Sequence, residues 1–237
     1  MPKWLVRLKG ERFDLEDFPE LLRSPEVRVV EENGSFYLES SEFNSLTSAE
    51  EVRERGRALI KLINGVAKFN RDNFLDVSED GITRVEDDGK RHHYVFLEGA
   101  ITARAKVSAQ VTVIAADGSE KVATQPSALE SLLEVAQKHN VVADALSFYR
   151  DDTWISLYKV YEIIRDDVGG KHQIIKNGWS VDSDINRFTQ TAQSRAALGD
   201  SARHASEKYK PPAQPMTLSG ARALIKTILS RWASSKT

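Results

Sequence analysis

The sequence of 237 residues contains no cysteine. This absence excludes disulfides, thiolate metal ligands and cysteine nucleophiles, and it fits a reducing compartment. No apolar run approaches the ~18 residues that a membrane-spanning helix needs, and the opening MPKWLVRLKG lacks the apolar core of a signal peptide. We therefore expect a cytoplasmic protein with no membrane-spanning segment.

An excess of charge of either sign is also missing. The 33 basic and 35 acidic residues give a formal net charge of −2, and hydrophobic residues make up 41% of the chain. No global field would therefore attract nucleic acid or an anionic membrane, although a local basic patch stays open. The apolar share is that of an ordinary globular protein, and the length allows one large domain or two modest ones.

Several catalytic signatures are absent as well. The sequence has no phosphate-binding glycine loop, no dinucleotide fingerprint, no HExxH and no GxSxG. His92 and His93 are adjacent in an expected strand, so their side chains should point to opposite faces and cannot chelate one ion together. We expect neither a metal site nor a cofactor.

The first half does contain apolar residues that alternate with a period of two. Asn33-Gly34 and Asp87-Asp88-Gly89-Lys90 have the composition of tight turns between such segments. Alternation of this kind predicts antiparallel strands with one face buried. We expect strands at residues 4–8, 27–31, 36–39, 82–85, 93–97 and 101–113.

Two helices are expected among these strands. Ser48 and Glu51 have the spacing of a capping box, and apolar residues follow at helical spacing, which predicts one long helix. The acidic segment at residues 11–23 is expected to form a short helix that packs Phe13, Leu15, Phe18 and Leu21.

Helical spacing takes over after Gln125-Pro126-Ser127. A long helix is expected from about residue 153 to residue 168, where Gly169-Gly170 stops it. The fold class is therefore α+β: an N-terminal antiparallel sheet with one long helix, followed by a C-terminal helical bundle. We assign residues 1–124 to the α+β domain and residues 125–237 to the bundle.

Residues 187–216 are the least expected stretch of the helical half. They contain Arg203-His204, the only adjacent Arg-His pair there, and end in a cluster of prolines. Histidine, with an ordinary pKa near about 6.5, can move a proton at neutral pH, while arginine stays charged and can hold a phosphate. Together they could cleave RNA without a metal, the 2′-hydroxyl acting as nucleophile. Adjacent residues could serve one phosphate only at a helix start or a turn.

The run from Trp154 to Trp232 contains the segments LYKVYEIIRDDVGG, RFTQTA, ARHA and PMTLSGARALI. On these segments it resembles the C-terminal part of an uncharacterised bacterial protein family. A small helical bundle with polar Arg and His also resembles, more distantly, the HEPN superfamily, whose active members are metal-independent RNases that commonly work as dimers. The hallmark of that superfamily is an Arg followed, after a short spacer, by a His. Arg165 and His172 match that spacing, whereas Arg203 and His204 have no spacer.

The same residues also have an ordinary structural interpretation. Arg203 could pair with Glu207, and Arg165 with Glu162, as surface salt bridges that contribute little. The favoured function is a non-catalytic interaction or regulatory protein, with a homodimer or another protein as partner, because complete catalytic motifs are missing. The alternative is a metal-independent RNA-binding or RNA-cleaving protein of HEPN-like type, with candidate catalytic residues Arg203, His204, Arg165 and His172.

Overall fold

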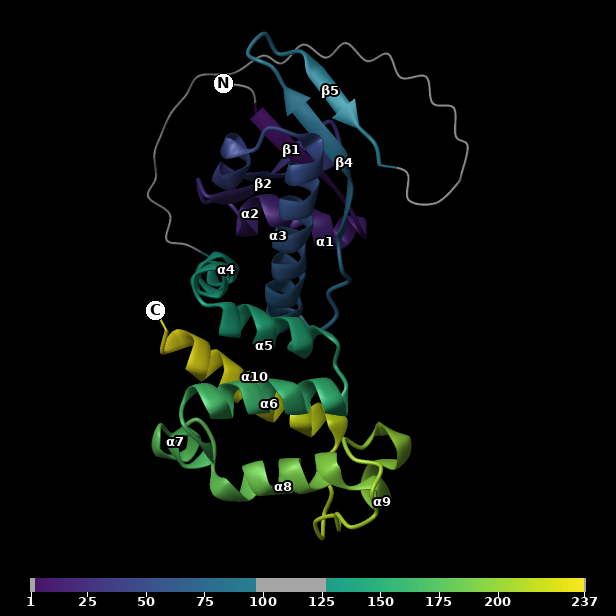
Figure 1. Cartoon of the computed structure of the whole chain (residues 1–237), viewed down its shortest axis with the longest axis vertical. Helices are drawn as coiled ribbons and strands as arrows, with labels where there is room; N and C mark the ends of the chain where they lie inside the picture. Colours follow the sequence, from purple (N-terminus) through teal and green to yellow (C-terminus); the bar gives the residue numbers. More distant parts are fainter. Residues whose placement is uncertain (1–2, 97–126, 237) are drawn as a thin grey trace.

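The computed structural model describes residues 3–96 and 127–236 (Figure 1). Within them the chain is α+β, as predicted: a five-stranded antiparallel sheet and one long helix precede a mostly helical part. The strand expected at residues 101–113 and the boundary expected between residues 124 and 125 lie outside the described residues.

The sheet has the strand order β2-β3-β1-β4-β5, and every neighbouring pair is antiparallel. Asn33 and Gly34 adopt φ angles of 52° and 75° in the turn between β2 and β3, as their composition predicted. The central strand is covered on both faces, because Leu5 is buried as well as Val6. The strands are β1 (Lys3–Lys9), β2 (Val27–Glu32), β3 (Ser35–Ser40), β4 (Ser78–Val85) and β5 (Arg91–Tyr94).

Two short helices, α1 (Arg12–Glu16) and α2 (Phe18–Leu21), replace the single helix expected at residues 11–23. Leu15 and Phe18 are buried as predicted, and Leu21 is half-buried, but Phe13 is 68% exposed. The prediction for Phe13 was wrong because Asp14 takes an inward position, where its carboxylate pairs with Arg71. A proline at the start of α2 lacks the N–H that would continue α1.

Helix α3 (Ala49–Asn70) connects the sheet to the helical part (Figure 1). Its first turn has the predicted capping box, in which Ser48 accepts from the Glu51 N–H and the Glu51 carboxylate accepts from the Ser48 N–H. Two glycines allow close packing along it. A Cβ on Gly56 would lie 2.8 Å from the Val6 side chain of β1, and one on Gly65 would lie 3.2 Å from the Leu146 carbonyl oxygen.

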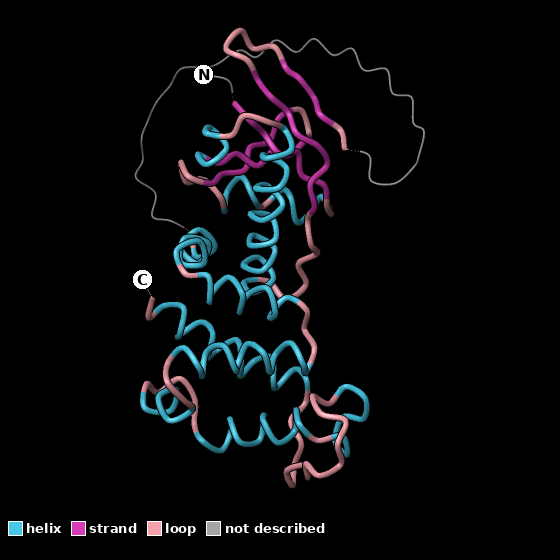
Figure 2. Tube along the Cα trace, in the orientation of Figure 1, coloured by secondary structure: helices cyan, strands magenta, loops and turns pink. Residues whose placement is uncertain are grey.

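The helical part stacks its longer helices in layers below the sheet (Figure 2). The long helix predicted from residue 153 is confirmed: Thr153 caps its first turn, and Gly169 and Gly170 follow it with φ angles of 82° and 128°. Short helices α7 and α9 and the single turn η1 (Ser41–Ser45) connect larger elements. The helices are α4 (Ala128–Lys138), α5 (Asn140–Arg150), α6 (Trp154–Asp167), α7 (Lys171–Lys176), α8 (Asp182–Gln193), α9 (Arg195–Leu198) and α10 (Leu218–Ser234).

A network of charged side chains, here called the Arg222 clasp, holds α10 against both parts of the molecule. Arg222 pairs with Asp152, in the turn between α5 and α6, and lies 3.4 Å from Asp72, which follows α3. Lys226 lies 3.0 Å from Asp72, and this hydrogen bond lowers the pKa of the Asp72 carboxyl. The Arg222 guanidinium also lies over the ring of Tyr149, whose pKa burial raises to about 12.

Candidate functional site

Residues 187–193 form the second half of α8, and the rest of the 187–216 stretch folds back against them. Thr191 donates from its hydroxyl to the Arg187 carbonyl at 2.7 Å and accepts from the Met216 N–H at 3.0 Å. Arg187 donates to the Gln214 carbonyl at 2.7 Å, and the Arg203 N–H donates to the Ala192 carbonyl at 2.8 Å. Because the middle and the far end of the stretch both bond to α8, the stretch is a compact connection between α8 and α10.

Arg203 is held in place by the two neighbouring helices. Its guanidinium donates to the Glu162 carboxylate of α6 at 2.8 Å and lies 4.3 Å from the centre of the Tyr158 ring. Gln193 of α8 donates to the Tyr158 hydroxyl at 2.7 Å and fixes that ring. The surface pair expected with Glu207 is therefore wrong, since Arg203 pairs with a residue of α6 that lies far away in the sequence.

The turn after α9 does bring the two members of the Arg-His pair together. His204 Nε2 lies 3.4 Å from a guanidinium nitrogen of Arg203. The imidazole is half-buried and stacks on Tyr209, with ring centroids 4.7 Å apart and an interplanar angle of 18°. One face of the imidazole is therefore covered by another side chain.

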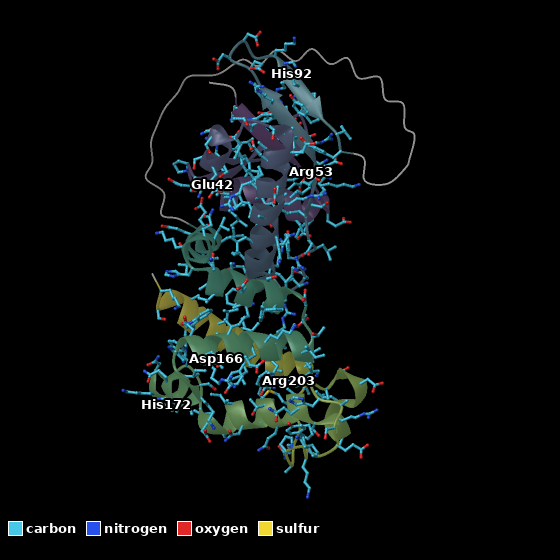
Figure 3. All side chains as sticks on the ribbon, in the orientation of Figure 1. Glu42, Arg53, His92, Asp166, His172 and Arg203 are labelled. Carbon is cyan, nitrogen blue, oxygen red and sulfur yellow. The ribbon has the colours of Figure 1, made fainter. Side chains whose placement is uncertain are left out.

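His172 lies apart from Arg203 (Figure 3), and Arg165 makes its contacts with other residues. Arg165 pairs with the adjacent Asp166 at 2.7 Å, so the pairing expected with Glu162 is wrong, because Glu162 binds Arg203 instead. The hydrogen bond that Arg165 donates to the Asp166 carboxylate raises the pKa of Arg165 above its ordinary value. His172, on α7, is exposed. Neither residue forms a hydrogen bond or ion pair with Arg203 or His204, all four lying in the described part of the chain.

The histidines of β5 point apart, as the sequence predicted. His93 Nδ1 lies 2.9 Å from the Thr83 hydroxyl, whereas His92 Nε2 lies 3.8 Å from the Glu86 carboxylate. Burial lowers the pKa of His93. Across residues 3–96 and 127–236, no group of three or more His, Asp or Glu residues could hold a metal ion. None of the helices described is long and apolar enough to cross a membrane.

Helix α4 lies on the side of α3 opposite to α1 (Figure 1). Three cavities that share lining residues extend from this helix to β1 and β3. The first, about 230 Å³, lies between α3, α4 and α5 and shares Gln137 with the second. The second, about 630 Å³, lies between α4 and the start of β2 and shares Pro25 and Ser41 with the third, which has about 480 Å³ beside β1 and β3. We call this series the α4 groove.

The floor of the α4 groove is apolar and its rim is polar. Val27 and Leu133, each 2% exposed, line the middle cavity. Four carboxylates and two basic side chains surround them, so the middle cavity has a formal charge of 2 − 4 = −2. The charged lining residues are Glu26, Glu42, Glu130, Glu134, Arg23 and Lys138.

One wall of the groove is fixed by a capping box that joins elements far apart in the sequence. Ser127 and Glu130 cap the first turn of α4. The Ser127 hydroxyl also donates to the Leu21 carbonyl at 2.6 Å, and Glu130 accepts from the Arg23 N–H. The Ser-x-x-Glu spacing was a sequence signal for the start of α4, but only the fold shows that the same residues bind the α2–β2 connection.

No protein-family model, no curated protein and no solved structure matches the chain. The resemblances to a bacterial family and to the HEPN superfamily therefore stay predictions.

Proposed function

We propose that the protein is a non-catalytic interaction or regulatory protein of the cytoplasm, and that it holds a segment of polypeptide in the α4 groove. The observation that carries this proposal is the series of three neighbouring cavities that share lining residues, from α5 to the end of β3. A long groove with an apolar floor and a polar rim suits an extended chain better than a small molecule.

The state of the Arg-His pair supports the same proposal. The Arg203 guanidinium already binds Glu162 and covers Tyr158, and stacking on Tyr209 covers one face of the His204 imidazole. The Glu162 carboxylate already neutralises the charge of Arg203, so a phosphate bound beside it would meet a like charge.

Selection of peptides from a displayed random library tests the proposal. Peptides enriched on the wild-type protein should share apolar residues and bind in the groove. Gln137→Trp places a large ring where the first two cavities meet, and it should weaken binding roughly tenfold or more, a cost of about 1.4 kcal/mol. Gln190→Trp, at an exposed position of α8, is the matched control and should bind as the wild type does.

Two outcomes would contradict the groove as the binding surface. The first is a library that yields no enriched peptide, and the second is equal affinity in wild type and Gln137→Trp. Sedimentation of the same proteins checks the other expected partner, a second copy of the chain. A homodimer through this surface would dissociate in Gln137→Trp and persist in Gln190→Trp.

RNA binding or cleavage is the second candidate function, and the 3.4 Å approach of Arg203 to His204 favours it. In the HEPN-like proposal, His204 moves a proton of the 2′-hydroxyl and Arg203 neutralises the phosphate. Mixed RNA incubated with the protein in chelator tests this. Cleavage should be lost in His204→Ala and reduced in Arg203→Lys. Two further variants, His172→Ala and Arg165→Ala, test whether Arg165 and His172 take part. Equal cleavage by every variant, or none by any, would contradict RNA cleavage by these residues.

A further inference from the structure

The Arg222 clasp contains polar atoms that the surrounding side chains and backbone do not satisfy. Within residues 3–96 and 127–236, five buried side-chain nitrogen or oxygen atoms lack a hydrogen-bond partner, and three of the five belong to this cluster. They are the Tyr149 hydroxyl oxygen, Asp152 Oδ1 and Arg222 Nε. Buried polar groups of native proteins are almost always hydrogen-bonded, to the protein or to an ordered water. Three unpartnered atoms in one cluster therefore point to a bound molecule that pairs with them.

The three atoms lie close together because the contacts of the clasp join their residues. Asp152 Oδ2 and Arg222 Nη1 form an ion pair, and the unpartnered atom of each residue is two covalent bonds away from that contact. The Arg222 guanidinium also lies over the fully buried Tyr149 ring, 5.2 Å from its centre. Burial raises the pKa of the Tyr149 hydroxyl to about 12, and the nearby Arg222 opposes that rise. The hydroxyl therefore approaches the guanidinium without a well-formed hydrogen bond to it.

The hydrogen-bonding chemistry of the three atoms matches one water molecule. With its pKa at about 12, the Tyr149 hydroxyl keeps its proton at neutral pH and can donate it. Arg222 Nε also donates, whereas the carboxylate oxygen Asp152 Oδ1 accepts. A water accepts from two donors and donates to an acceptor, and buried waters make about three hydrogen bonds. A charged ligand is disfavoured, because the two cations of the clasp already face two carboxylates.

We infer that the Arg222 clasp binds one ordered water molecule, which accepts from the Tyr149 hydroxyl and from Arg222 Nε and donates to Asp152 Oδ1. The water connects α10 to α5 and to the turn that follows α5, in addition to the direct ion pair. The inference does not depend on the proposed function, because none of the three residues lines the α4 groove. Either could therefore fail its test while the other passes.

Two measurements on the full chain detect the water directly. A crystal structure at a resolution that shows ordered solvent should place a water within hydrogen-bonding distance of the Tyr149 hydroxyl, Asp152 Oδ1 and Arg222 Nε. In solution, oxygen-17 magnetic relaxation dispersion counts the waters that stay bound longer than the protein takes to tumble. This number should fall by about one in Arg222→Met, which removes a partner of the water, and stay unchanged in the matched control Arg203→Met.

The sign of a stability change gives an independent test. Tyr149→Phe removes the hydroxyl and leaves the ring in place. If the hydroxyl donates to a water, the variant loses a hydrogen bond and the urea midpoint of unfolding falls. If the hydroxyl has no partner, the variant loses an unsatisfied buried group and the midpoint rises. Tyr158→Phe is the matched control, because the Tyr158 hydroxyl accepts directly from Gln193 at 2.7 Å and its removal should lower the midpoint without any water.

Three results would overturn the inference. The first is a crystal structure with no water at the clasp, and the second is an equal number of long-lived waters in Arg222→Met and the wild type. The third is a higher urea midpoint in Tyr149→Phe than in the wild type, which would show that the hydroxyl is unsatisfied. If Arg222→Met does not fold, the crystal structure of the wild type and the Tyr149→Phe midpoint still decide.

Discussion

Arg203 and Arg222 use the same arrangement in two regions of the molecule. Each guanidinium covers a tyrosine ring, Tyr158 at 4.3 Å and Tyr149 at 5.2 Å, and each pairs with a carboxylate. They differ in what they join. Arg203 fixes one connection to α6 within the helical part, whereas Arg222 joins α10 to the α5–α6 turn and to the end of α3.

The difference teaches that an unusual sequence context is a poor guide to the importance of an arginine. Arg203 stands out because a histidine follows it, yet its side chain is 31% exposed and makes local contacts. Arg222 lies in an ordinary amphipathic helix, yet its side chain is 12% exposed and holds three separate segments together. The contribution of each to stability should follow burial and the number of segments joined, and four substitutions test this.

The largest effect is expected for Arg222→Met. The change leaves Asp152 and Asp72 beside a side chain without charge, and it should lower the free energy of unfolding by about 2–3 kcal/mol, somewhat less than for a fully buried pair because Asp152 is 38% exposed. Urea denaturation at pH 7 measures it. Adding Asp152→Asn should recover part of the loss, as expected for coupled residues. A loss below about 0.5 kcal/mol for the single variant would contradict the role of the clasp.

A smaller effect is expected for Arg203→Met. Loss of one charged hydrogen bond and one cation–π contact at a half-exposed site should cost about 1–1.5 kcal/mol. Because the contacts of Arg203 fix only the connection between α9 and α10, limited proteolysis should cleave this connection faster in Arg203→Met than in the wild type. In Arg222→Met the faster cleavage should not be confined to this connection. If Arg203→Met costs more than Arg222→Met, the comparison of the two arginines fails.

Local signals in the sequence predicted much of the fold. The Asn33-Gly34 turn, the Ser48 cap and the stop at Gly169 each depend on residues a few positions apart, so composition and spacing identify them. The same reasoning failed for Phe13. Its exposure depends on the pairing of Asp14 with Arg71, and no periodicity within α1 reveals a partner that far along the chain.

The candidate site was harder to predict for the same physical reason. Arg203 has a carboxylate four residues away, Glu207, but its partner is Glu162 on another helix. The α4 groove likewise forms where α4 meets the α2–β2 connection, through the contact of Glu130 with the Arg23 N–H. Contacts between distant residues decide which groups converge, and a single sequence carries no direct record of them.

Asp167→Asn tests the other end of α10 with an effect that depends on pH. Asp167 accepts from Trp232 Nε1 at 2.8 Å and from Lys236 Nζ at 2.9 Å. Burial opposes its ionisation, but these hydrogen bonds outweigh burial and lower its pKa. Its contribution is therefore complete above the unfolded pKa of about 3.9 and is lost as the pH falls through the folded pKa.

The free energy of unfolding of the wild type should consequently exceed that of Asp167→Asn by about 1 kcal/mol at pH 7. This difference should shrink below about pH 4. Urea denaturation of both proteins at pH 7, 5 and 3 measures the trend. If the difference in free energy of unfolding stays constant from pH 7 to pH 3, the loss in Asp167→Asn comes from packing and not from the charge of the carboxylate. Such a result would also mean that α10 depends on the Arg222 clasp for its electrostatic anchoring.

The smallest effect is expected for His204→Ala. The imidazole is half-buried and its clearest contact is the stack on Tyr209, so its removal should cost about 0.5 kcal/mol, at the low end for an aromatic pair. His204→Phe keeps the stack and should restore the wild-type value in the same urea experiment. A loss as large as that of Arg203→Met would mean that the imidazole, rather than the guanidinium, fixes the connection.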